Sequence, residues 1–243
     1  MTKEYVTLDS KKEYIKIHGL QRSGTNYISH LVNENFIDTN ALVNLGGWKH
    51  GYYGVPWMLG HETHVLVVTK NPYAWLVSVY NYWGKNRKLN IGPDLNGIPF
   101  EDFVKNKIYL EKQKDIPYLV RATNPVQHWN NMNFHWLSIR INSKKLFVLA
   151  YEAVLENSKE VIKQIGNQFE VKQKKEFVES NTTFIPSGET LKPSNEKFNK
   201  EYYQKNDFMK EYSPELLEFV NSQLDLDVML RLGYPIVQPK EIA

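Results

Sequence analysis

The sequence predicts an α/β protein with three layers (α/β/α), in which helices cover both faces of a central, mainly parallel β-sheet. Two apolar runs, residues 64–68 (HVLVV) and 146–150 (LFVLA), are typical of strands that are buried on both faces. Each run is followed by a segment with helical spacing. Because strands that alternate with helices usually pair in parallel, this order indicates a sheet built from strand–helix units.

The first strand–helix unit lies near the start of the sequence. Apolar and polar residues alternate over residues 12–19, and the run stops at a glycine, which predicts a strand that enters a turn. Apolar residues then recur at three- and four-residue intervals over residues 25–36, which predicts a helix with one apolar face. A shorter candidate strand covers residues 41–45.

The remaining elements follow the same logic. A helix is expected after Asn71-Pro72, another over residues 154–169, and a third from Pro214, where Ser213 is the predicted N-cap. Two polar stretches separate these elements. We expect residues 84–117 to form a helical insertion and residues 181–200 to form a long loop. The whole of residues 1–243 is expected to be a single domain.

Composition excludes several classes of site. The chain has 243 residues, no cysteine, 13% aromatic residues and a formal net charge of +3. Without cysteine, disulfides, thiolate metal sites and iron–sulfur clusters are impossible. So small a charge excess does not indicate a nucleic-acid partner, and no apolar run reaches the roughly 18 residues of a membrane helix. We expect a soluble, cytoplasmic protein without a membrane span.

Residues 19–25 (GLQRSGT) lie where the first strand meets the first helix, so their backbone N–H groups should converge on an anion. Gly19 and Gly24 have the spacing of a nucleotide-binding P-loop, but Thr25 stands where nucleoside triphosphatases have lysine, followed by serine or threonine. The missing pair disfavours Mg²⁺-dependent ATP or GTP chemistry. Arg22 offers a guanidinium that can grip a sulfuryl or phosphoryl group. The structural alternative is a glycine turn with a solvent-facing arginine.

Residues 21–27 (QRSGTNY) resemble the 5′-phosphosulfate loop of the sulfotransferases, which use 3′-phosphoadenosine 5′-phosphosulfate (PAPS). A second element of that family is a strand that ends in a basic residue, usually arginine, then Asn-Pro or Asp-Pro, then a helix. A serine follows eight positions after the basic residue, and Lys70 and Ser78 repeat this spacing. A third element of the family is a strand that ends in Tyr-Glu, which Tyr151-Glu152 resembles. Residues 232–234 (LGY) resemble the end of many sulfotransferase domains.

This resemblance implies a P-loop-NTPase-like sulfotransferase fold and a role for each matching residue. Lys70 and Ser78 are expected to bind the 3′-phosphate, and Tyr27 and Tyr151 to lie at the adenine. Residues 181–200 fall where the family folds a flexible segment over the 3′-phosphate. The residues expected to hold the 5′-phosphosulfate are Gln21, Arg22, Ser23, Gly24, Thr25 and Asn26.

Sulfuryl transfer needs a general base near the acceptor and a cation near the leaving phosphate. The family places its histidine beyond the second strand and close to a lysine, which Lys49-His50 resembles. We predict that His50 is the base and that Arg22 and Lys49 are catalytic cations. His128 is the second candidate for the base. The alternative for His50 is that it is a solvent-exposed loop histidine without a catalytic role. His128 and His135 share a helix face, but no third ligand with zinc-like spacing is evident, so we expect no metal site.

The leading hypothesis is therefore a PAPS-dependent sulfotransferase that transfers a sulfuryl group to a hydroxyl or amine and releases adenosine 3′,5′-bisphosphate. Two alternatives stay open: a P-loop small-molecule kinase, and a catalytically silent nucleotide-binding protein of the same fold. The acceptor can be a phenol, a carbohydrate, a lipid alcohol or a protein tyrosine. The sequence does not indicate an oligomeric state.

Overall fold

The computed structural model describes residues 9, 11–42, 49–51, 63–83, 97–105, 122, 124–139, 143–179, 182–187, 190–197 and 199–239. In these ranges the first elements are β1 (Glu13–Gly19), α1 (Thr25–Asn35), β2 (Thr39–Leu42), β3 (His64–Thr69), α2 (Pro72–Trp83), α3 (Phe100–Lys105) and α4 (Pro125–Leu137). They are followed by η2 (Ser143–Lys145), β4 (Leu146–Ala150), α5 (Tyr151–Phe169), β5 (Thr182–Ser187), β6 (Thr190–Lys197), α6 (Lys200–Gln204), η3 (Asp207–Glu211), α7 (Pro214–Gln223) and α8 (Leu226–Leu232).

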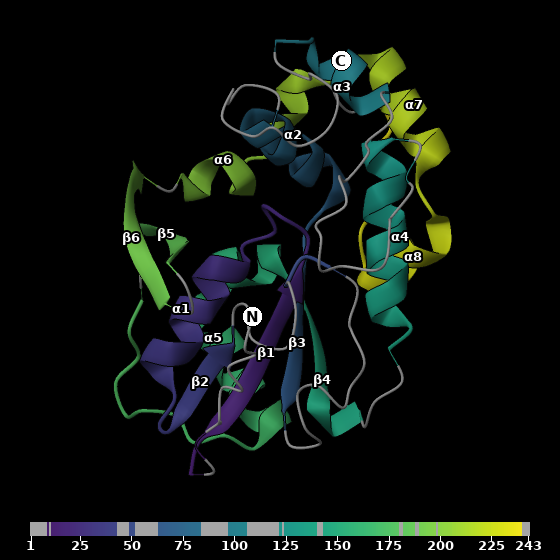
Figure 1. Ribbon diagram of the computed structural model, residues 1–243. Helices are drawn as coiled ribbons and strands as arrows, with labels where there is room; N and C mark the ends of the chain where they lie inside the picture. The colour runs from purple at the N-terminus through teal and green to yellow at the C-terminus, as the bar shows by residue number, and fades with distance from the viewer. Residues whose placement is uncertain are drawn as a thin grey trace, which may run out of the picture.

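Four parallel strands form the central sheet in the order β2-β1-β3-β4 (Figure 1). Strand β1 pairs with β2 and with β3, and β3 pairs with β4 through registers that include Val67↔Val148. Because the strands are parallel, their carboxyl ends meet at one edge of the sheet, which is where ligands bind in open α/β sheets. The loops after β1 and β3, which carry the two predicted phosphate motifs, both begin at this edge.

Helices cover both faces of the sheet, which confirms the predicted three-layer α/β architecture. Ile15 and Ile17 of β1 pack with α1 and α5 on one face. Val65 and Val67 of β3 pack with α2, α4, α7 and α8 on the opposite face. Figure 1 shows α1 on one side of the strands and α4 and α8 on the other. The buried β-branched run of β3 therefore contributes to both cores, as a strand with two covered faces should.

Two predicted boundaries are wrong by a few residues. Strand β2 begins at Thr39 rather than at residue 41, and residues 43–45 of the prediction lie outside the described residues. Helix α5 begins at Tyr151 rather than at residue 154, directly after β4. Asn157, with φ −150° and ψ 82°, kinks this helix after its first turns.

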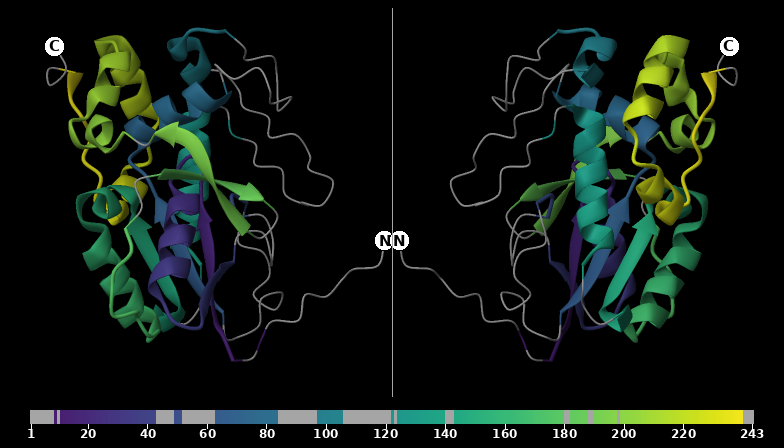
Figure 2. Two further views of the ribbon diagram at one scale, coloured as in Figure 1. Left: turned by 90° about the vertical axis from the view of Figure 1, so that its left-hand side faces the viewer. Right: turned by 90° about the vertical axis from the view of Figure 1, so that its right-hand side faces the viewer.

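The long loop predicted for residues 181–200 is wrong. This segment contains the antiparallel hairpin β5–β6, whose register includes Phe184↔Pro193 and Ile185↔Lys192. Pro186 and Pro193 lie within these strands, and a two-stranded ribbon has edge positions where a proline removes no ladder hydrogen bond. Figure 2 shows the hairpin apart from the central sheet and beside α1, and His30 of α1 stacks on Phe184 with ring centroids 3.9 Å apart.

Other predicted elements fare as follows. Ser213 caps α7 by accepting a hydrogen bond from Leu216 N at 3.1 Å, with Pro214 in the first helical position, as predicted. Of the expected insertion at residues 84–117, the structure describes residues 97–105, which include helix α3, and the remainder lies outside the described residues. No helix among the described residues has the length and apolar character needed to cross a membrane.

Candidate functional site

The loop after β1 turns sharply to place the start of α1 at the carboxyl edge of the sheet. Ser23 N and Ser23 Oγ both donate to Leu20 O, at 3.1 and 2.6 Å, which closes the turn. Arg22 and Gly24 have φ values of 67° and 87°, both in the left-handed region. Trp75 Nε1 of α2 donates to Gln21 O at 2.8 Å and fixes the loop from the other side. The first N–H groups of α1 lack intrahelical acceptors, so this geometry suits an anion.

Lys70 brings the second motif into contact with this loop. Its ammonium donates to Arg22 O at 3.3 Å, although its side chain is almost completely buried. Trp129 Nε1 donates to Lys70 O at 2.9 Å and holds the backbone in place. Burial lowers the pKa of Lys70, against a smaller opposing effect of Tyr203. Among the described residues, no carboxylate lies within ion-pair distance of Lys70 Nζ.

Tyr151 packs between the two motifs. Its ring lies against Gly24, where a Cβ would overlap it, and it lies 5.3 Å from Lys70 Nζ in cation–π geometry. Burial raises the pKa of Tyr151 well above its ordinary value. Burial also raises the pKa of Tyr27, on the first turn of α1, to about 12. Both tyrosines are therefore neutral at physiological pH and present aromatic surface beside the loop.

Ser78, the predicted partner of Lys70, is buried on α2, and its hydroxyl contributes to lowering the pKa of Tyr203 of α6. Lys70 Nζ lies 4.1 Å from the centroid of the Tyr203 ring, and its charge also lowers the pKa of Tyr203. Both Lys70 and Ser78 thus act on the electrostatics of Tyr203. No motif in the sequence marks Tyr203, whose place depends on the packing of α6 against α5, where Gln204 Nε2 donates to Leu155 O at 3.4 Å.

A carboxylate beside this site serves the backbone. Glu152 Oε1 accepts from Asn71 N at 3.0 Å, and Glu152 Oε2 accepts from Tyr234 Oη at 3.0 Å. The hydroxyl of Tyr234 also lies 3.2 Å from Thr69 Oγ1. Glu152 therefore ties the end of β3, the start of α5 and the C-terminal segment together, which fixes the position of Lys70.

Lys49 and Asn26 form the other part of the site. Lys49 is buried and donates from Nζ to Asn26 Oδ1. Asn26 Nδ2 donates to Phe184 O at 2.8 Å, which joins α1 to the β5–β6 hairpin. Gly19 N donates to Lys49 O at 3.1 Å, so residue 49 runs beside the end of β1. Thr25 is buried, and its carbonyl accepts from Ser29 Oγ at 2.8 Å.

His50 lies beside the same loop. Its Nδ1 is 2.7 Å from Gly19 O; because a carbonyl oxygen only accepts, Nδ1 carries the proton in the neutral ring and Nε2 is the basic nitrogen. Burial, followed by the charge of Lys49, lowers the pKa of His50 to about 3. The ring is therefore neutral at pH 7. An anion bound near Lys49 would offset that charge and raise the pKa of His50.

The two remaining candidates are the Arg22 side chain and His128. Arg22 has an exposed side chain whose guanidinium carbon is 4.9 Å from the centroid of the Tyr82 ring. His128 is buried on α4 at 6.1 Å from the ring of Trp75, and burial lowers its pKa to about 4. Among the described residues, no group of three or more His, Asp and Glu side chains could hold a metal ion. His128 thus belongs to a packed helix face.

The fold and the site together define an α/β protein with a glycine-containing loop, buried lysines and tyrosines at the carboxyl edge of a parallel sheet. The sequence matches no family model, and no curated protein matches it significantly. Solved structures that resemble the chain include mouse sulfotransferase SULT7A1 complexed with PAP, at 14% identity and a TM-score of 0.41. That alignment covers 66% of this chain and 58% of the mouse chain.

Proposed function

We propose that this chain is a sulfotransferase that uses PAPS. The observation that carries the proposal is the contact of Lys70 Nζ with Arg22 O at 3.3 Å, because it joins the two motifs in one site. A buried ammonium without a carboxylate partner is costly unless an anion compensates it. Lys70 therefore favours a ligand with a phosphate beside the loop.

Each part of a phosphoadenosine ligand has a matching group. Lys70 and Ser78 would bind the 3′-phosphate, and Tyr27 and Tyr151 would contact the adenine. The N–H groups at the start of α1 would hold the 5′-phosphosulfate, with cations supplied by Arg22 and Lys49. These assignments agree with the burial of Lys70 and Ser78 and with the packing of Tyr151 on Gly24.

The transfer forms a bond between the acceptor oxygen and sulfur and breaks the bond between sulfur and the bridging oxygen of the 5′-phosphate. Adenosine 3′,5′-bisphosphate leaves with the electrons of the broken bond. The acceptor proton goes to Nε2 of His50, which is neutral and available as a base at pH 7. Lys49 stabilises the negative charge that develops on the bridging oxygen.

The first experiment is calorimetric titration with adenosine 3′,5′-bisphosphate, AMP and ATP–Mg²⁺. Wild type is expected to bind the bisphosphate most tightly, and Lys70→Ala should lose that binding. Lys163→Ala is the matched control, because Lys163 is exposed on α5 and pairs with Glu160. Binding of ATP–Mg²⁺ but not of the bisphosphate would favour the kinase alternative and overturn the proposal.

The role of His50 needs a second experiment, with PAPS and a panel of phenols, carbohydrates, lipid alcohols and tyrosine peptides as acceptors. His50→Ala should lower turnover by roughly a hundredfold or more while bisphosphate affinity changes little. Unchanged turnover in this variant would remove His50 from the mechanism. Bisphosphate binding with no transfer to any acceptor would instead favour a silent nucleotide-binding protein.

A further inference from the structure

A second pocket lies between the start of α2, the segment from α6 to η3, and the C-terminal segment that follows α8. Its volume is about 520 Å³, which is within the usual range for sites that bind small molecules. None of the residues that line it is assigned to PAPS, so the occupancy of this pocket does not depend on the proposed function.

The apolar part of the lining is held in place by hydrogen bonds. Tyr73 and Phe208 are buried residues that line the pocket. Tyr73 Oη donates to Asn221 Oδ1 at 2.6 Å and accepts from Val237 N at 3.2 Å. Tyr212 Oη donates to Tyr73 O at 2.8 Å. Because several segments of the chain fix Tyr73, the pocket is formed before a ligand binds, as small-molecule sites usually are.

Two asparagines supply polar groups to the same pocket. Asn71 Oδ1 caps α2 by accepting from Tyr73 N at 3.0 Å, while no acceptor among the described residues hydrogen-bonds to Asn71 Nδ2. Asn206 has a left-handed φ of 55° between α6 and η3, and its side chain makes no hydrogen bond within the described part of the chain. Both amide groups are therefore donors that a ligand oxygen can accept.

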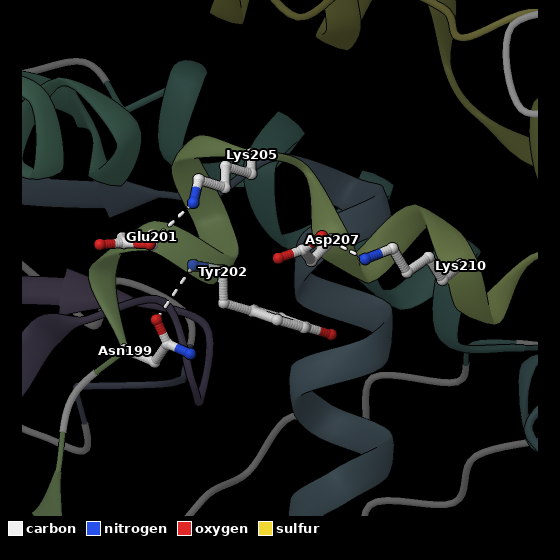
Figure 3. A network of polar contacts seen from close by, with 6 residues as sticks. All are labelled: Asn199, Glu201, Tyr202, Lys205, Asp207 and Lys210. Carbon is white, nitrogen blue, oxygen red and sulfur yellow. Dashed lines mark hydrogen bonds and ion pairs between the residues drawn. The ribbon is translucent and has the colours of Figure 1, made fainter.

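The charged residues of the lining are two exposed lysines, and no acidic residue in the described ranges lines the pocket. Figure 3 shows how each lysine is held: Lys205 pairs with Glu201 at 2.8 Å, and Lys210 pairs with Asp207 at 2.5 Å. An ammonium has three N–H donors, and each pair uses one of them. Both lysines thus keep donors for an anionic group at the rim of the pocket.

We propose that this pocket binds a small aromatic carboxylate. The ring of such a ligand contacts the apolar lining at Tyr73 and Phe208, and its carboxylate accepts from Lys205 and Lys210. A neutral ring would leave the lysines without an acceptor, and a simple anion would leave the apolar lining in contact with water. The positive rim and the apolar interior together select a ligand that has both parts.

The test uses 2-naphthoate as the probe and its uncharged amide, 2-naphthamide, as the comparison, with binding to the full chain measured by calorimetry. Wild type should bind 2-naphthoate saturably and more tightly than 2-naphthamide. Lys205→Ala and Lys210→Ala should each weaken 2-naphthoate binding by about two- to fivefold, the effect of one exposed charge pair, and should not change 2-naphthamide binding. Lys163→Ala is the matched control, because Lys163 is also exposed and paired, with Glu160, and it should change neither affinity.

Two further variants locate the bound probe. Met209→Trp should block both probes, because Met209 also lines the pocket. Lys70→Ala should bind 2-naphthoate as wild type does, and a loss of binding in this variant would place the probe in the nucleotide site and overturn the proposal. Absence of saturable 2-naphthoate binding, wild-type affinity in both Lys205→Ala and Lys210→Ala, or an equal loss in Lys163→Ala would also overturn it. Circular dichroism checks that Met209→Trp is folded, and the lysine variants decide the question if it is not.

Discussion

The ring of Tyr151 lies directly against the backbone of Gly24, so that a Cβ at Gly24 would overlap the ring atoms Cε2 and Cδ2. The same ring lies 5.3 Å from Lys70 Nζ. Tyr151 follows β4, Gly24 follows β1 and Lys70 follows β3, so one side chain connects the ends of three strands. The site therefore depends on a close approach that only glycine permits.

Gly24→Ala should be destabilising and should weaken bisphosphate binding. The left-handed φ of 87° costs alanine about 1–2 kcal/mol, and the overlap with Tyr151 adds to that cost. Gly97→Ala is the matched control, since Gly97 has φ 79° and open space where its Cβ would lie. Urea denaturation of both variants should show the larger loss for Gly24→Ala, and equal losses would contradict the predicted overlap.

Tyr234→Phe should lower the free energy of unfolding by about 1–2 kcal/mol, the cost of leaving a partly buried carboxylate acceptor without its donor. Glu152 Oε2 loses its hydrogen bond from Tyr234 in this variant. Tyr14→Phe serves for comparison, because the hydroxyl of Tyr14 accepts an exposed hydrogen bond from Asp9 N. Urea denaturation should show little change for Tyr14→Phe. If Tyr234→Phe had the same urea midpoint as wild type, the hydrogen bond from Tyr234 to Glu152 would not stabilise the fold.

Acidification should destabilise the protein through its buried histidines. Burial, followed by the charge of Lys16, lowers the pKa of His18 to about 3, and those of His50 and His128 are lowered to about 3 and about 4. The unfolded chain binds protons on these rings near pH 6.5, whereas the folded chain does not. Stability is therefore complete above about pH 6.5 and falls as the pH drops toward 4.

His128→Phe provides the check on this pH dependence. The variant removes one titrating ring, so its stability should fall less steeply between pH 6.5 and 4, by at most about 1.4 kcal/mol per pH unit. Guanidinium denaturation at several pH values measures the difference between the two slopes. Parallel stability curves for wild type and the variant would show that His128 is protonated in the folded state as readily as in the unfolded one.

Binding of the bisphosphate should be accompanied by proton uptake at alkaline pH. Burial lowers the pKa of Lys70 in the free protein, and a bound phosphate favours the charged ammonium and raises that pKa. Affinity should therefore decrease as the pH rises. Titrations in buffers of different ionisation enthalpy measure the protons taken up; a proton release, or no exchange, would contradict the assignment of Lys70.

The sheet and its neighbouring helices were predictable because their signals are local. Residues 64–69 are almost uniformly apolar and β-branched, and they form β3 with both faces covered. Ser213 and Pro214 mark the start of α7 through cap geometry. The hairpin over residues 182–197 was not predictable in this way, because proline is unusual in strands; in the structure its Phe184 stacks on His30 of α1.

Part of the candidate site was also predictable from the sequence. The spacing of Lys70 and Ser78 predicted that they act together, and both lower the pKa of Tyr203, whose ring centroid lies 4.1 Å from Lys70 Nζ. The adjacent pair Lys49-His50 led to the prediction of His50 as the base. Its 2.7 Å contact with Gly19 O and its low pKa, however, depend on burial by the fold. Tyr203 had no signal in the sequence, because it reaches the site only through the position of α6.

The strand–helix order and the glycine loop follow from local patterns in the chain, because each depends on neighbours a few positions apart. Which distant residues come together at the candidate site depends on the packed fold. Tyr234 reaches Glu152 across 82 positions of the chain, and Asn26 reaches Phe184 across 158. Such contacts follow from how the layers pack, and packing is a property of the whole chain rather than of any segment.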